Sequence, residues 1–183
     1  MQQWLEQAVK NNLEIIQDGR CQLCGANTLH GVAECVETAG YITHKISHAK
    51  AVESMSLFLC VDAHALTHTQ IHGRWNNHFH LARLHLILVD RIQWEYAYSP
   101  LLSEVLDVYK MNRTQEYIHS PDAAYRTKIT VLDVDAAQDE KTHIALAWRW
   151  AHEVYASYTN GHHIVATLSQ QFKDTAHPKL QAS

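Results

Sequence analysis

Residues 60–72 read CVDAHALTHTQIH and place Cys60, His64, His68 and His72 four residues apart. Side chains at positions i and i+4 lie on one face of an α-helix, so this spacing predicts a helical stripe of potential metal ligands. The whole stripe cannot wrap one ion, because its ends would lie about 18 Å apart at a rise of about 1.5 Å per residue. We therefore expect this stretch to contribute one ligand, His68, to a site that begins elsewhere in the chain.

A cysteine-rich segment over residues 19–40 is the predicted start of that site. It contains Cys21-x2-Cys24-Gly25 and Cys35. Two thiolates three positions apart in a tight turn can face one ion, and Gly25 has the backbone freedom that such a turn requires. Cys35 is the natural third ligand. We interpret the segment as a compact cysteine knuckle.

The fourth ligand of this predicted site comes from a histidine or from Cys60, and we favour His68. Sulfur-rich tetrahedral sites suit zinc, so the predicted site is zinc bound by Cys21, Cys24, Cys35 and His68. With four protein ligands the ion would be structural, and with three it would keep a position open for catalysis. Two interpretations compete with zinc. One is a redox pair, which is disfavoured because no βαβ pattern precedes the cysteines, and the other is ordinary buried thiols.

Apolar residues recur at helical spacing along most of the chain. The pattern predicts helices over residues 2–18, 41–71, 78–97, 100–111 and 139–160, followed by a shorter helix over 162–172. Asn77 and Ser99 are the expected N-caps of two of them. Residues 112–128 are polar and loop-like, and ITVLDV (129–134) is a β-type run too short to imply a sheet. The fold class is therefore mainly α: a helical bundle in a single domain over residues 1–183, with the knuckle inserted after its first helix.

The charge of the chain argues against several partners. The formal net charge is −4 and the pI is about 6.4, without a concentrated run of lysine or arginine. This gives no electrostatic footprint for nucleic acid or an anionic membrane surface. No apolar run approaches the roughly 20 residues that cross a bilayer, and the N-terminus lacks the apolar core of a signal peptide. We expect a cytoplasmic protein whose four cysteines are thiols or metal ligands rather than disulfides.

Fifteen histidines are the compositional anomaly of the chain, and neutral imidazole is the commonest metal ligand. Asp62 is a candidate to orient a ligating histidine, and we assign candidate catalytic roles to Asp62 and His64. Histidines and carboxylates from several helices could also build a non-haem iron site in a bundle. The sequence contains neither HExxH nor a paired Glu-x2-His motif, and no GxSxG, P-loop or GxGxxG motif.

A set of short motifs runs through most of the chain: CxxCG, a later cysteine, VDA-x-A-x-x-H, TV-x-DV, and W-A-x-x-V-aromatic followed by histidine. The fragments are Cys21-x2-Cys24-Gly25, Cys35, Val61-Asp62-Ala63-His64-Ala65 with His68, Thr130-Val131-Leu132-Asp133-Val134, and Trp150-Ala151-His152-Glu153-Val154-Tyr155 with His162-His163. In this order they resemble an uncharacterised bacterial family, a domain of unknown function. The chain departs from that family where a histidine precedes the VDA segment, since Leu57 and Leu59 stand there. The resemblance implies a metal-site architecture and no established activity.

These observations predict a metal-binding protein with zinc, or alternatively iron, as its cofactor. The first functional hypothesis is a metal-dependent enzyme, for example a hydrolase, that acts on a small molecule through metal-activated water or a polarised substrate oxygen. The second is a non-catalytic zinc-stabilised module whose aromatic C-terminal helix, with Trp148, Trp150, Tyr155 and Tyr158, binds a protein partner. Core packing is the commoner explanation of such aromatics. The third hypothesis is a non-haem iron enzyme in the helical bundle.

Overall fold

A computed structural model of the chain describes residues 3–45, 51–112, 116–121 and 127–180. Within these ranges the chain forms eight α-helices, two short 3-10 helices and no β-strand. The elements are α1 (Gln3–Lys10), α2 (Gly31–Lys45), α3 (Ala51–Thr67), η2 (Thr69–Ile71), α4 (Asn76–Leu88), α5 (Tyr98–Met111), α6 (Val131–Asp135), α7 (Glu140–Ser157), η3 (Thr159–Gly161) and α8 (His162–Leu180). The mainly α fold class is confirmed. Among the described residues, no helix is long and apolar enough to cross a membrane.

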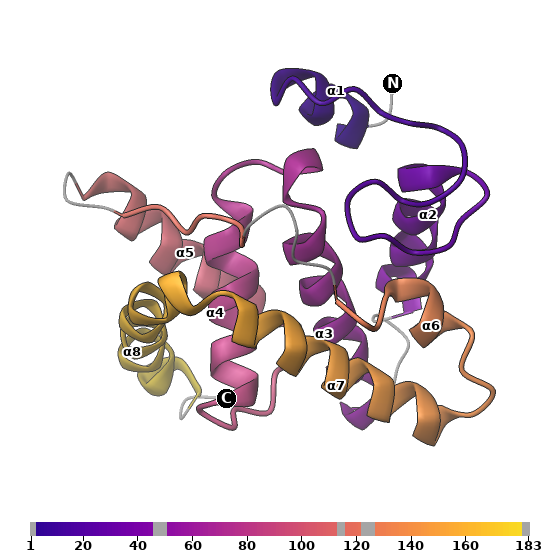
Figure 1. The fold of residues 1–183 in the computed structure, drawn as a ribbon. Coiled ribbons are helices and arrows are strands. Elements are labelled where there is room, and N and C mark those ends of the chain that lie inside the picture. The colour runs from indigo at the N-terminus through magenta and orange to yellow at the C-terminus, as the bar shows by residue number, and fades with distance from the viewer. Residues whose placement is uncertain (1–2, 46–50, 113–115, 122–126, 181–183) are drawn as a thin grey trace.

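Helix α3 lies at the centre of the bundle, where it contacts α2, α4 and α7. Figure 1 shows α7 crossing α3, and α8 packs against α4 and α5. A helix that is apolar on most faces is expected to have neighbours on several sides. Leu57 and Leu59 of α3, and Leu81 and Leu84 of α4, are accordingly buried. The core of the bundle therefore surrounds the helix that carries the predicted histidine stripe.

The N-terminal helix is shorter than the predicted range 2–18, because α1 ends at Lys10. Asn12 adopts a left-handed conformation with a φ of 54°, and the Leu13 N–H donates to the Ala8 carbonyl at 2.9 Å. This is the Schellman type of helix end, in which asparagine takes a position that glycine more often fills. The apolar residues beyond Asn12 continue the helical spacing without continuing the helix.

Helix α2 begins earlier than predicted, at Gly31 rather than near residue 41, so the second half of the predicted knuckle is helical. Gly31 has a φ of 58°, and a Cβ atom there would collide with the Ile16 carbonyl oxygen. Glu34 Oε2 accepts hydrogen bonds from the backbone N–H groups of Leu29 at 2.8 Å and His30 at 3.2 Å. Glycine and Glu34 together allow the chain to turn directly from the loop into the helix.

The stretch that was expected to be helical as far as residue 71 leaves the helix at Thr67 and continues into η2. His68 has φ and ψ of −123° and 36°, outside the helical region. The prediction of one continuous stripe is therefore wrong at its C-terminal end. His64 remains on α3, whereas His68 and His72 flank the 3-10 turn.

The helix predicted over 78–97 is shorter and begins earlier. Helix α4 starts at Asn76 with Trp75, not Asn77, at its N-cap position. Arg91 has a φ of 60° and reverses the chain after the helix. Trp94, within the predicted range, lies after the helix, where it is buried and stacks on Phe172 of α8.

Two other helix starts differ from the prediction. Helix α5 begins at Tyr98, so Ser99 lies in its first turn and is not its N-cap. The β-type run 129–134 instead contributes to the short helix α6. Its capping box joins Thr130 and Asp133, with the Asp133 carboxylate accepting from the Thr130 N–H at 2.8 Å and the Thr130 hydroxyl at 2.7 Å. Here local capping outweighs the β-propensity of the run.

Candidate metal centre

The residues predicted as metal ligands lie together. The ligand atoms of Cys21, Cys24, Cys35 and His68, which we call the Cys3His cluster, are all within 4.8 Å of one another. All four residues are buried, with at most 3% of their surface exposed. The cluster joins three parts of the chain, namely the knuckle loop, α2 and the segment after α3. These four residues could hold one metal ion.

Two distances within the Cys3His cluster match those of a tetrahedral zinc site. The Sγ atoms of Cys24 and Cys35 are 3.8 Å apart, and Cys21 Sγ lies 3.4 Å from His68 Nε2. With Zn–S bonds of about 2.3 Å and Zn–N bonds of about 2.0–2.1 Å, tetrahedral geometry requires about 3.8 Å between sulfurs and about 3.5 Å between sulfur and nitrogen. These two pairs are already spaced for an ion of this size, and the remaining pairs lie within 4.8 Å.

The turn that carries Cys21 and Cys24 is formed by backbone hydrogen bonds. The Gly25 N–H donates to the Cys21 carbonyl at 2.8 Å, and the Cys21 N–H donates to the Ala26 carbonyl at 3.0 Å. Gly25 has a φ of 81°, a conformation that side chains disfavour. Gly25 thus has the backbone conformation that its position after the CxxC motif predicts. Both thiols consequently face the same side of the turn.

The ends of the knuckle loop are also joined to each other. The Gly19 N–H donates to the Leu29 carbonyl at 3.1 Å, and the Gly31 N–H donates to the Gly19 carbonyl at 3.2 Å. Across the loop, Arg20 Nε donates to Asn27 Oδ1 at 2.9 Å. The loop is therefore closed by contacts that do not involve the cysteines.

Cys35 reaches the cluster from α2. The buried positions of this helix include Val32, Cys35, Ala39 and Ile42, which recur at the three- and four-residue spacing of one helical face. Because α2 packs against α3, this face points toward the centre of the bundle. The packing of an ordinary amphipathic helix thus positions the third thiol.

His68 is oriented by its other ring nitrogen. Its Nδ1 lies 2.9 Å from the His64 carbonyl oxygen and 3.1 Å from the Thr67 hydroxyl. If Nδ1 carries the proton and donates to this carbonyl, the lone pair of Nε2 points toward Cys21. A backbone carbonyl commonly fixes the tautomer of a ligating histidine in this way. The last turn of α3 therefore supplies the groups that orient the ligand, and the ligand follows directly after the helix.

The three thiols perturb one another because they share a small buried space. Hydrogen bonding from Cys24 and then Cys35 lowers the pKa of Cys21, whereas the proximity of Cys21 and Cys24 raises the pKa of Cys35. Burial by itself would lower the pKa of His68, but its contacts with Cys21 and Cys24 raise this pKa to about 9. Deprotonated thiols in this shared buried space would repel one another, and a divalent ion would offset their negative charge.

The fourth cysteine, Cys60, lies outside the cluster although it belongs to the same helix as Asp62 and His64. Burial, followed by the charge of Asp62, raises the pKa of Cys60 to about 12. A buried thiol with a raised pKa behaves as a small apolar side chain. His68 rather than Cys60 therefore completes the group of four.

The two residues with predicted catalytic roles have different surroundings. Asp62 is fully buried and accepts hydrogen bonds from Arg83 Nη2 at 2.6 Å and from His80 Nδ1 at 2.6 Å, both on α4. The His64 ring stacks on His68 with centroids 4.0 Å apart. Burial lowers the pKa of His64, and it lowers that of His72 to about 4. His64 therefore contacts a residue of the cluster, whereas the side-chain partners of Asp62 are on α4.

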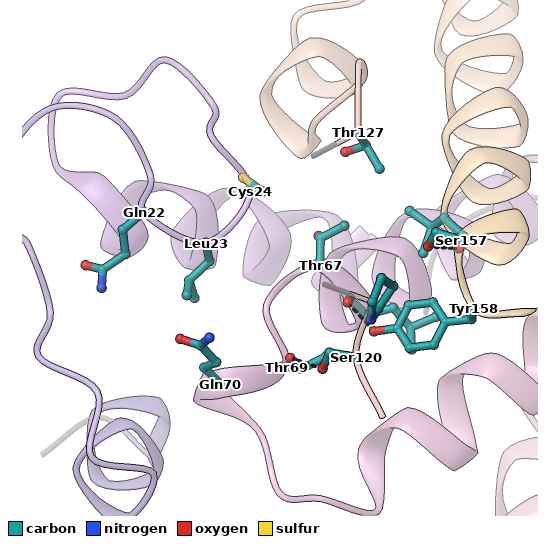
Figure 2. A pocket seen from close by; sticks show the side chains of 13 residues that line it. Gln22, Leu23, Cys24, Thr67, Thr69, Gln70, Ser120, Thr127, Ser157 and Tyr158 are labelled. Carbon is teal, nitrogen blue, oxygen red and sulfur yellow. Dashed lines mark hydrogen bonds between the residues drawn. The ribbon is translucent and has the colours of Figure 1, made fainter. Parts of the chain in front are cut away.

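A cavity of about 120 Å³ adjoins the cluster at Cys24. Figure 2 shows hydroxyl side chains around it, from Thr67, Thr69, Ser120, Thr127, Ser157 and Tyr158. The Tyr158 hydroxyl donates to the Leu66 carbonyl at 2.7 Å. These hydroxyls could not be predicted from the sequence, because they come from separate segments and have no common spacing. The cavity has room for several water molecules or one small polar molecule.

Residues 19–159 match a family of unknown function, DUF5946. The chain belongs to this family. The matched range begins at the knuckle and includes the whole Cys3His cluster and the cavity. A search of curated proteins and a search of solved structures find no match. The family assignment agrees with the resemblance seen in the sequence, and the function has to be argued from the site itself.

Proposed function

We propose that this protein binds one zinc ion at the Cys3His cluster and that the ion is structural. The observation that carries the proposal is the approach of four buried ligand atoms within 4.8 Å of one another. Four protein ligands complete a tetrahedral zinc site and leave no position for a substrate, as in structural zinc centres. Thiolate and imidazole are ligands that zinc prefers over calcium or magnesium.

The proposed ion would join segments that are distant in the sequence. Cys21 and His68 are 47 residues apart, and they approach only in the folded chain. Because such a site does not exist in the unfolded chain, the free energy of zinc binding becomes free energy of folding. We place the protein in the cytoplasm, where its thiols would remain reduced.

The test is the zinc content of the purified protein, measured by elemental analysis. We expect one equivalent in the wild type, and loss of zinc in Cys21→Ser and in His68→Ala. Cys60→Ala is the matched control, because Cys60 is equally buried but lies outside the cluster. The proposal is wrong if the wild type carries only traces of zinc, or if Cys60→Ala loses as much as Cys21→Ser. Retention of zinc in His68→Ala alone would place the fourth ligand elsewhere.

The cavity beside Cys24 supports a second function, that of a metal-dependent enzyme acting on a small molecule. Its hydroxyl lining suits a small polar compound, which would bind beside the closed zinc site. A panel of small carboxylic acids, amides and alcohols can be screened against the zinc-loaded protein by NMR. We expect binding that Ser157→Val weakens and that an exposed-site control, Ser103→Val, leaves unchanged. Absence of binding by the whole panel would argue against this function.

A third function, a zinc-stabilised module that binds a protein partner, remains an alternative. Its predicted surface was the aromatic part of α7. Trp150 and Tyr158 are buried, and Trp148 and Tyr155 are packed against the core. A partner would therefore have to contact other residues of the chain.

A further inference from the structure

Three histidines beside the Cys3His cluster share one region of the bundle. His64 lies on α3, His72 follows η2, and His80 lies on α4; we call them the histidine trio. The Nε2 atoms of His64 and His72 are both buried and have no hydrogen-bond partner. An unpartnered buried nitrogen is costly and calls for a bound ion or water. Two such atoms in one place point to a ligand.

The members of the trio lie where α3, η2 and α4 meet. The rings of His64 and His72 are nearly perpendicular, with centroids 6.5 Å apart. His80 contacts Asp62, which lies two residues before His64 on α3, at 2.6 Å. The three rings come from three successive elements, so the contact of α3 with α4 is what brings them together.

His80 is oriented in the manner of a metal ligand. Its Nδ1 lies 2.6 Å from Asp62 Oδ1, so Nδ1 donates to the carboxylate and Nε2 keeps its lone pair. A carboxylate in this position is a recurrent partner of ligating histidines. Arg83 also contacts Asp62, through Nε and Nη2. The arginine fixes the carboxylate and balances its charge.

We propose that His64, His72 and His80 form a second metal site, which is rich in nitrogen and takes a divalent transition metal ion such as zinc or iron(II). Imidazole ligands suit both ions. Three protein ligands leave at least one position for water, which is the coordination of catalytic rather than structural zinc. The three ligands are neutral, so the site would keep the full positive charge of the ion and favour ionisation of the bound water.

The trio is more open than the Cys3His cluster, because its ligand atoms do not all lie within 4.8 Å of one another as those of the cluster do. Two imidazoles that bind one tetrahedral ion through Nε2 have ring centroids about 5 Å apart, so His64 and His72 have to approach by about 1 Å. His72 lies at the end of a 3-10 turn and is only partly buried, and small rotations of its side chain would bring it closer. We therefore expect weaker binding at the trio than at the cluster.

Cobalt(II) distinguishes the two sites, because thiolate ligands give intense charge-transfer absorption and imidazole ligands do not. Metal-free full-length protein is titrated with cobalt(II). We expect a first equivalent with thiolate charge transfer and a second equivalent with only weak visible bands. The variants His72→Ala and His80→Ala should lose the second equivalent and keep the first, which also reports that each variant is folded. His152→Ala, at an exposed histidine, is the matched control.

The cobalt titration of the wild type and the variants has outcomes that support or overturn the second site. Loss of the second equivalent in His72→Ala and His80→Ala, with full binding in His152→Ala, supports the second site. The proposal is overturned if the wild type binds no cobalt beyond the thiolate site, as when water alone fills the space between the rings. It is also overturned if the second equivalent persists in both variants or disappears in His152→Ala. Cys21→Ser affects the thiolate bands and leaves the trio in place, so failure of one site is distinguishable from failure of the other.

Discussion

The Cys3His cluster and the histidine trio both use the C-terminal part of α3, yet their ligands are positioned in different ways. In the cluster, two of the four ligands sit on a turn whose backbone hydrogen bonds form locally, and the ligand atoms are within 4.8 Å of one another. In the trio, each ligand comes from a different element, and His80 depends on the ion pair between Asp62 and Arg83. Local backbone geometry therefore positions two of the cluster's four ligands, whereas helix packing positions all three ligands of the trio.

This difference has a physical consequence. A turn closed by its own hydrogen bonds can present ligands even when the surrounding helices shift, whereas ligands on separate helices move with those helices. Perturbing the knuckle should therefore affect zinc at the cluster, and perturbing the contact between α3 and α4 should affect the trio.

Removal of metal from the cluster should have the largest effect on stability. Structural zinc contributes about 10–16 kcal/mol to the folding of zinc-finger peptides near pH 7, and part of this should be lost here. Each kcal/mol shifts Tm by about 2–4 °C in a chain of this size, so we expect EDTA to lower Tm by about 10 °C or more. Thermal denaturation followed by circular dichroism measures the change.

Cys60→Ala should show the same EDTA-dependent decrease in Tm as the wild type, because Cys60 lies outside the cluster. An unchanged Tm of the wild type after complete removal of metal would contradict a structural role of the ion.

The substitution Asp62→Asn should come next. Arg83 is only 4% exposed, so loss of the carboxylate would leave a buried positive charge without a partner. We expect the free energy of unfolding to fall by about 3–5 kcal/mol, measured by urea denaturation. The same variant should bind less cobalt at the trio while the thiolate bands of the cluster remain.

Asp107→Asn is the control for this substitution, because Asp107 forms an exposed ion pair with Lys110 at 2.8 Å. Exposed pairs contribute about 0–1 kcal/mol, so this variant should be nearly as stable as the wild type. If both variants lost the same free energy of unfolding, the buried contact between Asp62 and Arg83 would stabilise the fold no more than an exposed ion pair.

Gly31→Ala should have an intermediate effect and should act on the knuckle. A Cβ atom would collide with the Ile16 carbonyl oxygen, and the φ of 58° is unfavourable for alanine. We expect a loss of about 1–3 kcal/mol together with weaker zinc binding, measured by competition with a chromogenic chelator. Gly40→Ala is the control, since a Cβ there meets nothing within 4 Å, and it should be neutral or slightly stabilising.

The smallest expected effect is that of Asn11→Ala. The Asn11 side-chain amide donates to the carbonyls of Gln70 at 2.8 Å and His72 at 3.3 Å, so it connects α1 to the segment that carries one member of the trio. Loss of these exposed contacts should cost about 1 kcal/mol. Cobalt binding at the trio should weaken, with the cluster unaffected.

Asn160→Ala removes a comparable exposed contact, to the His119 carbonyl at 3.3 Å, and should leave cobalt binding at both sites unchanged. If both asparagine variants weakened the trio equally, the link from α1 to His72 would have no specific role.

Much of the Cys3His cluster was predictable because its signals are local. The CxxC spacing and the glycine after it describe one turn, and the hydrogen bonds of this turn join only residues 21, 25 and 26. His68 was predicted for a less secure reason, since its spacing suggested a continuous helical stripe. In the structure the helix ends at Thr67, and His68 reaches the cluster because it leaves the helix.

The helix boundaries at Asn12 and Gly31 were missed for a related reason. Apolar spacing detects a buried face, but it does not detect a left-handed residue that stops the helix or a close backbone contact that requires glycine. The partners of Asp62 were also missed. His80 and Arg83 lie on another helix, and no spacing within the sequence connects them to Asp62.

The sequence by itself determined the helical class, the turn that pairs Cys21 with Cys24, and the set of residues from which a metal site could be built. These properties depend on side-chain periodicity and on backbone preferences over a few residues. Only the tertiary structure decided which histidine joins the thiols, which carboxylate orients His80, and where a cavity forms. Those contacts join residues far apart in the chain, and the packing of α3 against its neighbours determines which of them approach.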